Sequence, residues 1–234
     1  IVETPRYECT LASQDMQVQY RPFLVKEEKI LLVAMESKDN NEIINATKQV
    51  IQACTYNKID VDKLPMFDIE YLLLQIRAKS VGEISKFKVV CPDDKQTVTD
   101  VELDLSTVEV QVEDDHTNKI VIDEKRNLGL VLNYPSLGIT KAGFDVNKTD
   151  SDSMFNVICS CIDHIYEGDK VYPAKDSTQK ELKDFIESIT QKAFLDIKKF
   201  FETAPQLRHE VEVTNPKTGV KSKVTFKGLQ DFFQ

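Results

Sequence analysis

The chain has 234 residues, of which 41% are hydrophobic and 29% charged, with a formal net charge of −9 and a pI of about 5.0. This length holds one large domain or two small ones, and the composition is typical of a globular protein. The negative charge argues against broad nucleic-acid binding and against attraction to anionic membranes, since both need surplus Lys and Arg. No apolar run approaches the roughly 20 residues of a membrane-spanning helix.

The first 134 residues alternate between the periods typical of strands and of helices. In chain order the pattern predicts strands at 5–12 and 16–20, a helix at 26–37, a helix capped by Asn40 or Asn41, and a helix after Pro65. A hairpin at 86–105 and strands at 108–112, 119–123 and 128–134 follow. The helix after Pro65 is apolar on more than one face, which predicts a central position. Proline suits a helix start because its missing N–H has no partner there.

In the second half we expect a helix that begins near Ser151 or Ser153 and carries Phe155, Ile158, Ile162 and Ile165 at helical spacing. This assignment places His164 one helical turn from Cys161. A turn at 168–173 follows, and then a helix opened by a capping box of Thr178 and Glu181. A further helix at 190–203 leads into a basic hairpin at 205–228.

Residues 66–105 and 190–229 have the same order of elements, a helix followed by two strands around a proline-containing turn. We therefore predict an α+β fold with two helical lobes, each followed by a β-hairpin. Internal duplication would explain the shared order of elements, and so would a chance match, because units of a helix and a hairpin are common. The predicted divisions are an N-terminal α+β lobe at 1–112, connecting strands and a loop at 113–149, and a C-terminal helical lobe with its hairpin at 150–234.

The turn of the first hairpin contains Cys91-Pro92-Asp93-Asp94. A zinc-ribbon knuckle places two cysteines on one such turn, so that both thiolates point at one metal. Here Asp94 stands in the second cysteine position, and the second turn, Thr214-Asn215-Pro216-Lys217, has no cysteine. The hairpins are thus predicted to be degenerate zinc-ribbon-like hairpins that bind no metal.

No motif for catalysis or cofactor binding occurs in the sequence. A glycine-rich phosphate loop, G-x-S-x-G and H-E-x-x-H are all absent, and the three histidines lie far apart. Five cysteines leave one unpaired in any disulfide scheme, which indicates reduced thiols in a cytoplasmic protein. We predict no enzyme activity, no catalytic residues and no cofactor.

The two hairpins differ in charge. Nine acidic residues and one lysine lie between Asp93 and Asp115, whereas five basic residues and two glutamates lie between Pro205 and Gly228. Two solvated faces would explain the contrast. The sharper hypothesis is head-to-tail contact between copies, or contact of the basic hairpin with an acidic partner, because complementary charge sets encounter and register.

Three long strings resemble one known family: QYRPFLVKEEKILLVAMES at 19–37, PMFDIEYLLLQIRAKSVGE at 65–83 and EVTNPKTGVKSKVTFKGLQDFF at 212–233. They are similar to the baseplate hub subunit of T-even-type contractile-tailed bacteriophages, in the form found in marine and cyanobacterial phages. The resemblance implies a structural protein that helps to assemble the central hub beside other hub proteins and the tape-measure protein. It also implies location in the host cytoplasm during assembly and in the tail baseplate of the virion if the protein is retained.

The leading hypothesis is a non-enzymatic structural or assembly protein that acts through contacts with other phage hub or tail proteins, and through self-association. One alternative is a transient tail-assembly chaperone that binds the tape-measure protein and is absent from the virion. Another is a metal- or nucleic-acid-binding module built on the hairpins. The residues predicted to form contact surfaces are Tyr20, Arg21, Phe23, Lys217, Lys221, Lys223, Lys227, Phe232 and Phe233. For Phe232 and Phe233 the alternative is that the pair folds back on the core of its own chain.

Overall fold

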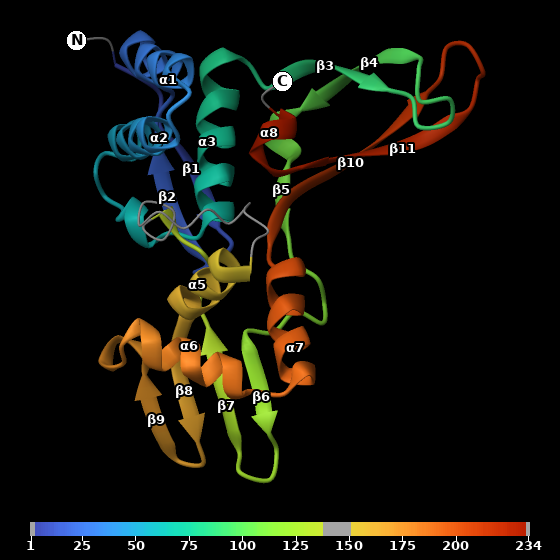
Figure 1. Ribbon diagram of the computed structural model, residues 1–234. Helices are drawn as coiled ribbons and strands as arrows, with labels where there is room; N and C mark the ends of the chain where they lie inside the picture. Colours follow the sequence, from blue (N-terminus) through green and yellow to red (C-terminus); the bar gives the residue numbers. More distant parts are fainter. Residues whose placement is uncertain (1–2, 138–150, 233–234) are drawn as a thin grey trace. The chain divides into compact units, whose positions relative to one another are not determined.

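The computed structural model describes residues 3–137 and 151–232, and these fold into a mixture of helices and small antiparallel sheets (Figure 1). The predicted α+β class is confirmed. The chain divides into two compact units, of which unit 1 combines Ile1–Gln111 with Pro205–Gln234 and unit 2 is Val112–Ala204. Among the described residues, no helix has the length and apolar content that crossing a membrane requires.

Unit 1 contains three long helices, two long hairpins and a short N-terminal hairpin. Its elements are β1 (Tyr7–Leu11), β2 (Met16–Tyr20), α1 (Val25–Ser37), α2 (Asn40–Cys54), a 3-10 turn (Val61–Lys63), α3 (Met66–Val81), β3 (Ile84–Val90), β4 (Val98–Asp104), a second 3-10 turn (Leu105–Thr107), β5 (Glu109–Gln111), β10 (Gln206–Thr214), β11 (Lys221–Lys227) and α8 (Gly228–Phe232).

Helix α3 lies at the centre of unit 1, as its apolar pattern predicts. Leu72, Leu74 and Ile76 are fully buried, and Leu74 and Ala78 belong to the core cluster that also receives side chains from both long hairpins. The helix begins directly after Pro65, as expected. Helix α2 is capped by Asp39 and not by an asparagine, because the Asp39 carboxylate accepts from the backbone N–H groups of the first turn.

Unit 2 is a four-stranded antiparallel sheet in the order β6-β7-β8-β9, with helices packed on one face. Its elements are β6 (Lys119–Asp123), β7 (Leu128–Leu132), α5 (Ser151–Cys161), β8 (Ile162–Glu167), β9 (Lys170–Pro173), a 3-10 turn (Ala174–Asp176), α6 (Gln179–Ser188) and α7 (Gln191–Glu202). The predicted capping box is present at α6, where the Glu181 carboxylate accepts from the Thr178 N–H at 2.7 Å.

The helix predicted to continue through Ile165 ends at Cys161, so the assignment of residues 162–165 was wrong. These residues begin β8, and His164 lies on that strand, where its Nδ1 is 2.7 Å from the Asp163 carboxylate. The register of β8 against β7 shifts between the partners of Val131 and Leu132. Because such a bulge adds one residue, Ile162 and Ile165 both face the core, which imitates helical spacing.

The observed units divide the chain differently from the predicted lobes. The boundary after Gln111 lies one residue from the predicted limit at 112, but the predicted C-terminal lobe is split, since α7 belongs to unit 2 and β10–β11 to unit 1. The strands predicted as connectors, β6 and β7, are half of the unit 2 sheet. Residues 138–149 of the predicted connector lie outside the described part of the chain. Long-range packing of the second hairpin against α3 and the first hairpin accounts for the difference.

Candidate docking surface on the paired hairpins

The turns of the two long hairpins share one backbone geometry. In the first turn the N–H of Lys95 donates to the carbonyl of Cys91 at 2.9 Å, and in the second the N–H of Gly219 donates to that of Asn215 at 2.8 Å. The two donor residues, Lys95 and Gly219, have positive φ angles of 55° and 73°. A proline follows the first residue in each turn, which favours the same tight reversal.

The Asp94 carboxylate is used inside the first turn. It accepts from the backbone N–H groups of Gln96 and Thr97 at 3.0 and 2.9 Å and from the Thr97 hydroxyl at 2.5 Å. These donors hold the pKa of Asp94 well below its usual range. The position that would carry a second zinc ligand in a zinc ribbon therefore stabilises the turn.

The two turns contact each other through the neighbouring carboxylate. Asp93 accepts from the side-chain amide of Asn215 at 3.0 and 3.1 Å and from the Thr218 hydroxyl at 2.6 Å. Asn215 is 1% exposed, and its side-chain oxygen Oδ1 accepts from the Lys217 N–H at 2.8 Å. Donation from Thr218 and Asn215 lowers the pKa of Asp93. The acidic hairpin thus meets the basic one within a single chain.

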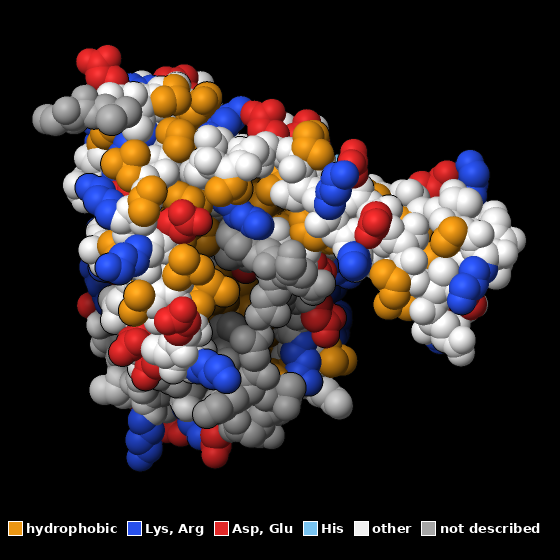
Figure 2. Space-filling model, turned by 90° about the horizontal axis from the view of Figure 1, so that it is seen from above, with side chains coloured by type: hydrophobic (Ala, Val, Ile, Leu, Met, Phe, Trp, Pro, Cys, Tyr) orange, Lys and Arg blue, Asp and Glu red, His pale blue; other side chains and the backbone are white. Residues whose placement is uncertain are grey.

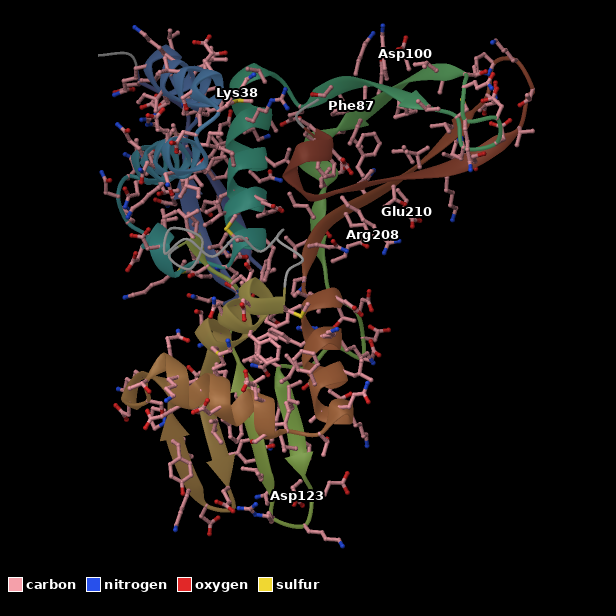
Figure 3. All side chains as sticks on the ribbon, in the orientation of Figure 1. Lys38, Phe87, Asp100, Asp123, Arg208 and Glu210 are labelled. Atoms are coloured by element: carbon pink, nitrogen blue, oxygen red, sulfur yellow. The ribbon has the colours of Figure 1, made fainter. Side chains whose placement is uncertain are left out.

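The hairpins also share an apolar interior. Phe87 of β3 points toward the second hairpin (Figure 3), and its ring lies 5.1 Å from that of Phe226 on β11 in an edge-to-face contact. Phe226 in turn contacts Phe232 of α8, and the centroids of their two rings are 5.7 Å apart. The guanidinium of Arg77 donates to the Phe232 carbonyl at 2.7 Å and fixes α8 to α3.

On their outer faces the hairpins have charges ordered by strand. Apart from Arg208, which pairs with Lys227 near the base of the second hairpin, the charged residues of the inner strands β4 and β10 are carboxylates and those of the outer strands β3 and β11 are lysines. Lys86 and Glu102, Lys88 and Asp100, and Lys223 and Glu212 are thus cross-strand neighbours of opposite charge. Lys86 lies 3.0 Å from Glu102, and Lys221 lies 3.2 Å from Glu212. Figure 2 shows Lys and Arg interspersed with Asp and Glu over the face of the hairpins in view.

A groove of about 540 Å³ runs between the two inner strands. Its lining comes from four consecutive residues of β4, Thr99 to Glu102, and four of β10, Val211 to Thr214. Val213 is buried, whereas Asp100 and Glu212 are exposed. The exposed lining of the groove is thus polar and acidic, and Val101 and Val213 are buried on the opposite face of the strands.

The predicted contact residues are placed in two ways. The lysines at 217, 221, 223 and 227 are exposed on the second hairpin. Tyr20 and Phe232 are 2% and 0% exposed and pack inside unit 1, and Phe233 lies outside the described residues.

The segment that follows Tyr20 joins elements within unit 1. The Arg21 guanidinium donates to the buried Glu27 carboxylate at 2.9 Å, and the N–H of half-buried Phe23 donates to the Ser80 hydroxyl at 2.9 Å. These contacts tie the residues that follow β2 to α1 and α3.

The cysteines show no sign of activation. All five are free thiols, and four are buried. Burial raises the pKa of Cys161 to about 12 and that of Cys159 to about 11, so both remain protonated and poorly nucleophilic at neutral pH. Within residues 3–137 and 151–232, no three His, Cys, Asp or Glu side chains are grouped so that they could hold a metal ion.

Sequence reasoning missed the residues that join the hairpins. Asp93 has the sequence context of a solvated loop carboxylate, and nothing local links it to Asn215. The available signal was the matched proline in the two turns, which indicates equivalent turns but not that they touch.

Charged strands around a groove, on a support of packed aromatic rings, are features of a protein–protein contact surface. The chain belongs to the T4 bacteriophage base plate protein family, whose model matches residues 4–234. Membership gives it a structural role in the baseplate of the phage tail, in contact with other tail or baseplate proteins. Comparisons with curated proteins and with solved structures find no match.

Proposed function

We propose that this baseplate protein is a subunit of the central hub and that it acts without catalysis, by holding neighbouring hub or tail proteins in register. The family match gives the baseplate, and the three long sequence strings support the hub within it. The observation that carries the contact role is the pairing of the hairpins. Their apolar faces and turns are satisfied within the chain, which leaves rows of charge on the outside.

The four exposed lysines of the second hairpin are the proposed point of contact with an acidic partner or with a second copy. Because the two turns already meet within the chain, contact between copies would use the outer faces of the hairpins and not their apolar sides. Charge on such faces governs the rate and register of association more than its affinity. The same proposal places the protein in the host cytoplasm during assembly and, after that, in the virion.

Mass spectrometry of purified virions and of isolated hub intermediates tests the proposal. A constant ratio of this chain to other hub proteins in both samples supports a hub subunit. Presence in hub intermediates with absence from virions supports the assembly chaperone instead. Recovery with baseplate material that lacks hub proteins would rule out the hub assignment and leave the family assignment intact.

A further inference from the structure

We propose that the groove between β4 and β10 binds an extended segment of a partner protein. The main chain of this segment pairs with a free strand edge, and its side chains alternate between Lys or Arg and aliphatic residues. The inference deepens the proposed function, since the partner would be another tail protein. The binding itself is measurable in solution, whatever the place of the chain in the baseplate.

Two strand edges meet at this groove without a strand partner. Within the described residues, β4 pairs with β3 alone. Strand β10 pairs with β11 along its length but with β5 only through Gln206, Leu207 and Arg208. The backbone of β4 from Thr99 to Glu102 and that of β10 from Val211 to Thr214 therefore line the groove with one edge of each strand free. Natural proteins usually cover, shorten or interrupt such edges, because they pair readily with other chains.

The side chains around the groove define the occupant. Val101 and Val213 are 9% and 4% exposed and face the apolar interior, so alternate residues of an added strand would meet aliphatic side chains there. The intervening residues would lie beside Asp100, Glu102 and Glu212, and none of the residues that line the groove is basic. Exposed carboxylates on one face of the strands and buried valines on the other thus favour an occupant with basic and aliphatic side chains in alternation.

The order of charge across the hairpins points to the same occupant. The outer strands β3 and β11 present lysines, and the inner strands β4 and β10 present carboxylates. A strand carrying Lys or Arg paired with the free edge of β4 or of β10 would continue this alternation, with the carboxylates of that edge flanked by cations on both sides. Opposite charges on neighbouring strands are favourable, and like charges are unfavourable. Four residues line each side, which suits a segment of about four to six residues at roughly 3.4 Å per residue.

The test uses the full chain and a fluorescein-labelled eight-residue peptide that alternates Val and Lys. Fluorescence anisotropy measures its affinity, and hydrogen exchange measures protection of the backbone amides. We expect saturable binding, with slower exchange within 99–102 or 211–214. A peptide with Glu in place of Lys should bind at least tenfold more weakly. A peptide with the Lys residues but with N-methylated main chain should also lose at least tenfold, because it cannot donate to a strand edge.

Matched variants of the protein locate the site. The pair Asp100→Lys and Glu102→Lys should weaken binding of the Val–Lys peptide at least tenfold. The pair Asp184→Lys and Glu187→Lys makes the same change in charge on the exposed face of α6 and should leave the affinity within twofold. If the first pair unfolds, Asp100→Asn with Glu102→Gln keeps the size of the side chains and should still weaken binding.

Three results would overturn the inference. One is an affinity that is equal for both lysine pairs. Another is equal binding of the N-methylated peptide, which would reduce the interaction to non-specific charge. The third is sedimentation of the free chain as a dimer with both edges already protected from exchange, because the occupant would then be a second copy. None of these results bears on whether the protein is found in the hub, which mass spectrometry of particles decides separately.

Discussion

The side-chain amide of Asn215 donates to the carboxylate of Asp93, 122 residues earlier in the chain, and this contact joins the turns of the two long hairpins. Asn215 is buried, and its side-chain oxygen Oδ1 organises its own turn. One side chain therefore fixes both the shape of the second turn and its place against the first.

Replacement of Asn215 by Ala should lower the free energy of unfolding by about 1–3 kcal/mol, because buried polar groups lose their partners. Urea denaturation followed by circular dichroism measures the loss. Thr214→Ala, at the exposed neighbouring position, should change the value by less than about 0.5 kcal/mol. Equal effects of the two substitutions would mean that the contact between the turns adds nothing to stability.

The contact between the turns should also depend on pH in the acid range. Hydrogen bonds from Thr218 and Asn215 lower the pKa of Asp93 below its ordinary value of 3.8. A carboxyl group whose pKa is depressed by folding contributes stability above its unfolded pKa, and the contribution is lost as the pH falls through the folded pKa. The pH-dependent shift of the Asn215 amide NMR signals should therefore have its midpoint below 3.8. A midpoint above 3.8 would contradict this assignment, and Asp93→Asn should abolish the transition.

Arg21 and Lys26 allow a matched comparison, because both lie near the Glu27 carboxylate, which is 2% exposed. Arg21→Gln should reduce the free energy of unfolding by about 1.5–3 kcal/mol, since the buried carboxylate loses a charge-assisted hydrogen bond. Lys26, which is 70% exposed, should contribute less than about 1 kcal/mol when replaced by Gln. Thermal denaturation of both variants measures the difference. A stable Arg21→Gln variant that fails to bind other baseplate proteins would instead support the predicted contact role of Arg21.

Gly129 of β7 lies under the ring of Tyr166 on the neighbouring strand, and a Cβ atom at this position would collide with the tyrosine ring and hydroxyl. Gly129→Ala should destabilise unit 2 by about 1–3 kcal/mol through overpacking. In a Tyr166→Ala background the same substitution should cost less, because the collision with the ring is removed and only the close approach to the Ile120 backbone carbonyl oxygen remains. The double-mutant cycle, measured by urea denaturation, gives the coupling between the two residues. Additive effects would show that the ring does not limit this position.

Reversal of charge at Lys217, Lys221, Lys223 and Lys227 by substitution with Glu tests the proposed contact face. We expect at least a tenfold loss in the yield of hub intermediates that contain the protein, because the exposed basic row of the second hairpin is removed. Four exposed lysines of unit 2, at 170, 175, 180 and 192, serve as the matched control when changed to Glu. Normal assembly of the first variant, confirmed by mass spectrometry, would end the role of this face.

Local signals in the sequence predicted the elements well. Pro65 indicated the start of α3, and Thr178 with Glu181 indicated the start of α6, because capping depends on residues within one turn. The β8 strand was missed because a bulge gives Ile162 and Ile165 the spacing of a helix. A spacing of three residues does not distinguish one turn of a helix from a strand that contains a bulge.

The arrangement of the hairpins could not be predicted for a different reason. Their charges and turns are visible in the sequence, but the contact of Phe87 with Phe226 depends on packing between segments more than a hundred residues apart. A resemblance between two segments suggests two lobes, whereas the same two hairpins pack together within one unit.

The pairing of β5 with β10 has a consequence for the order of folding during synthesis. Gln111 and Gln206 are partners in the ladder, so the whole of unit 2 emerges from the ribosome between two strands that must later join. Unit 2 is continuous in sequence and can fold as soon as residues 112–204 are free, since domains generally fold as units. The apolar face of β3–β4 must wait for translation of β10, β11 and α8. During that interval Phe87 and its neighbours are exposed. Either a chaperone covers them, or their aggregation is slow enough for the second hairpin to be synthesised first.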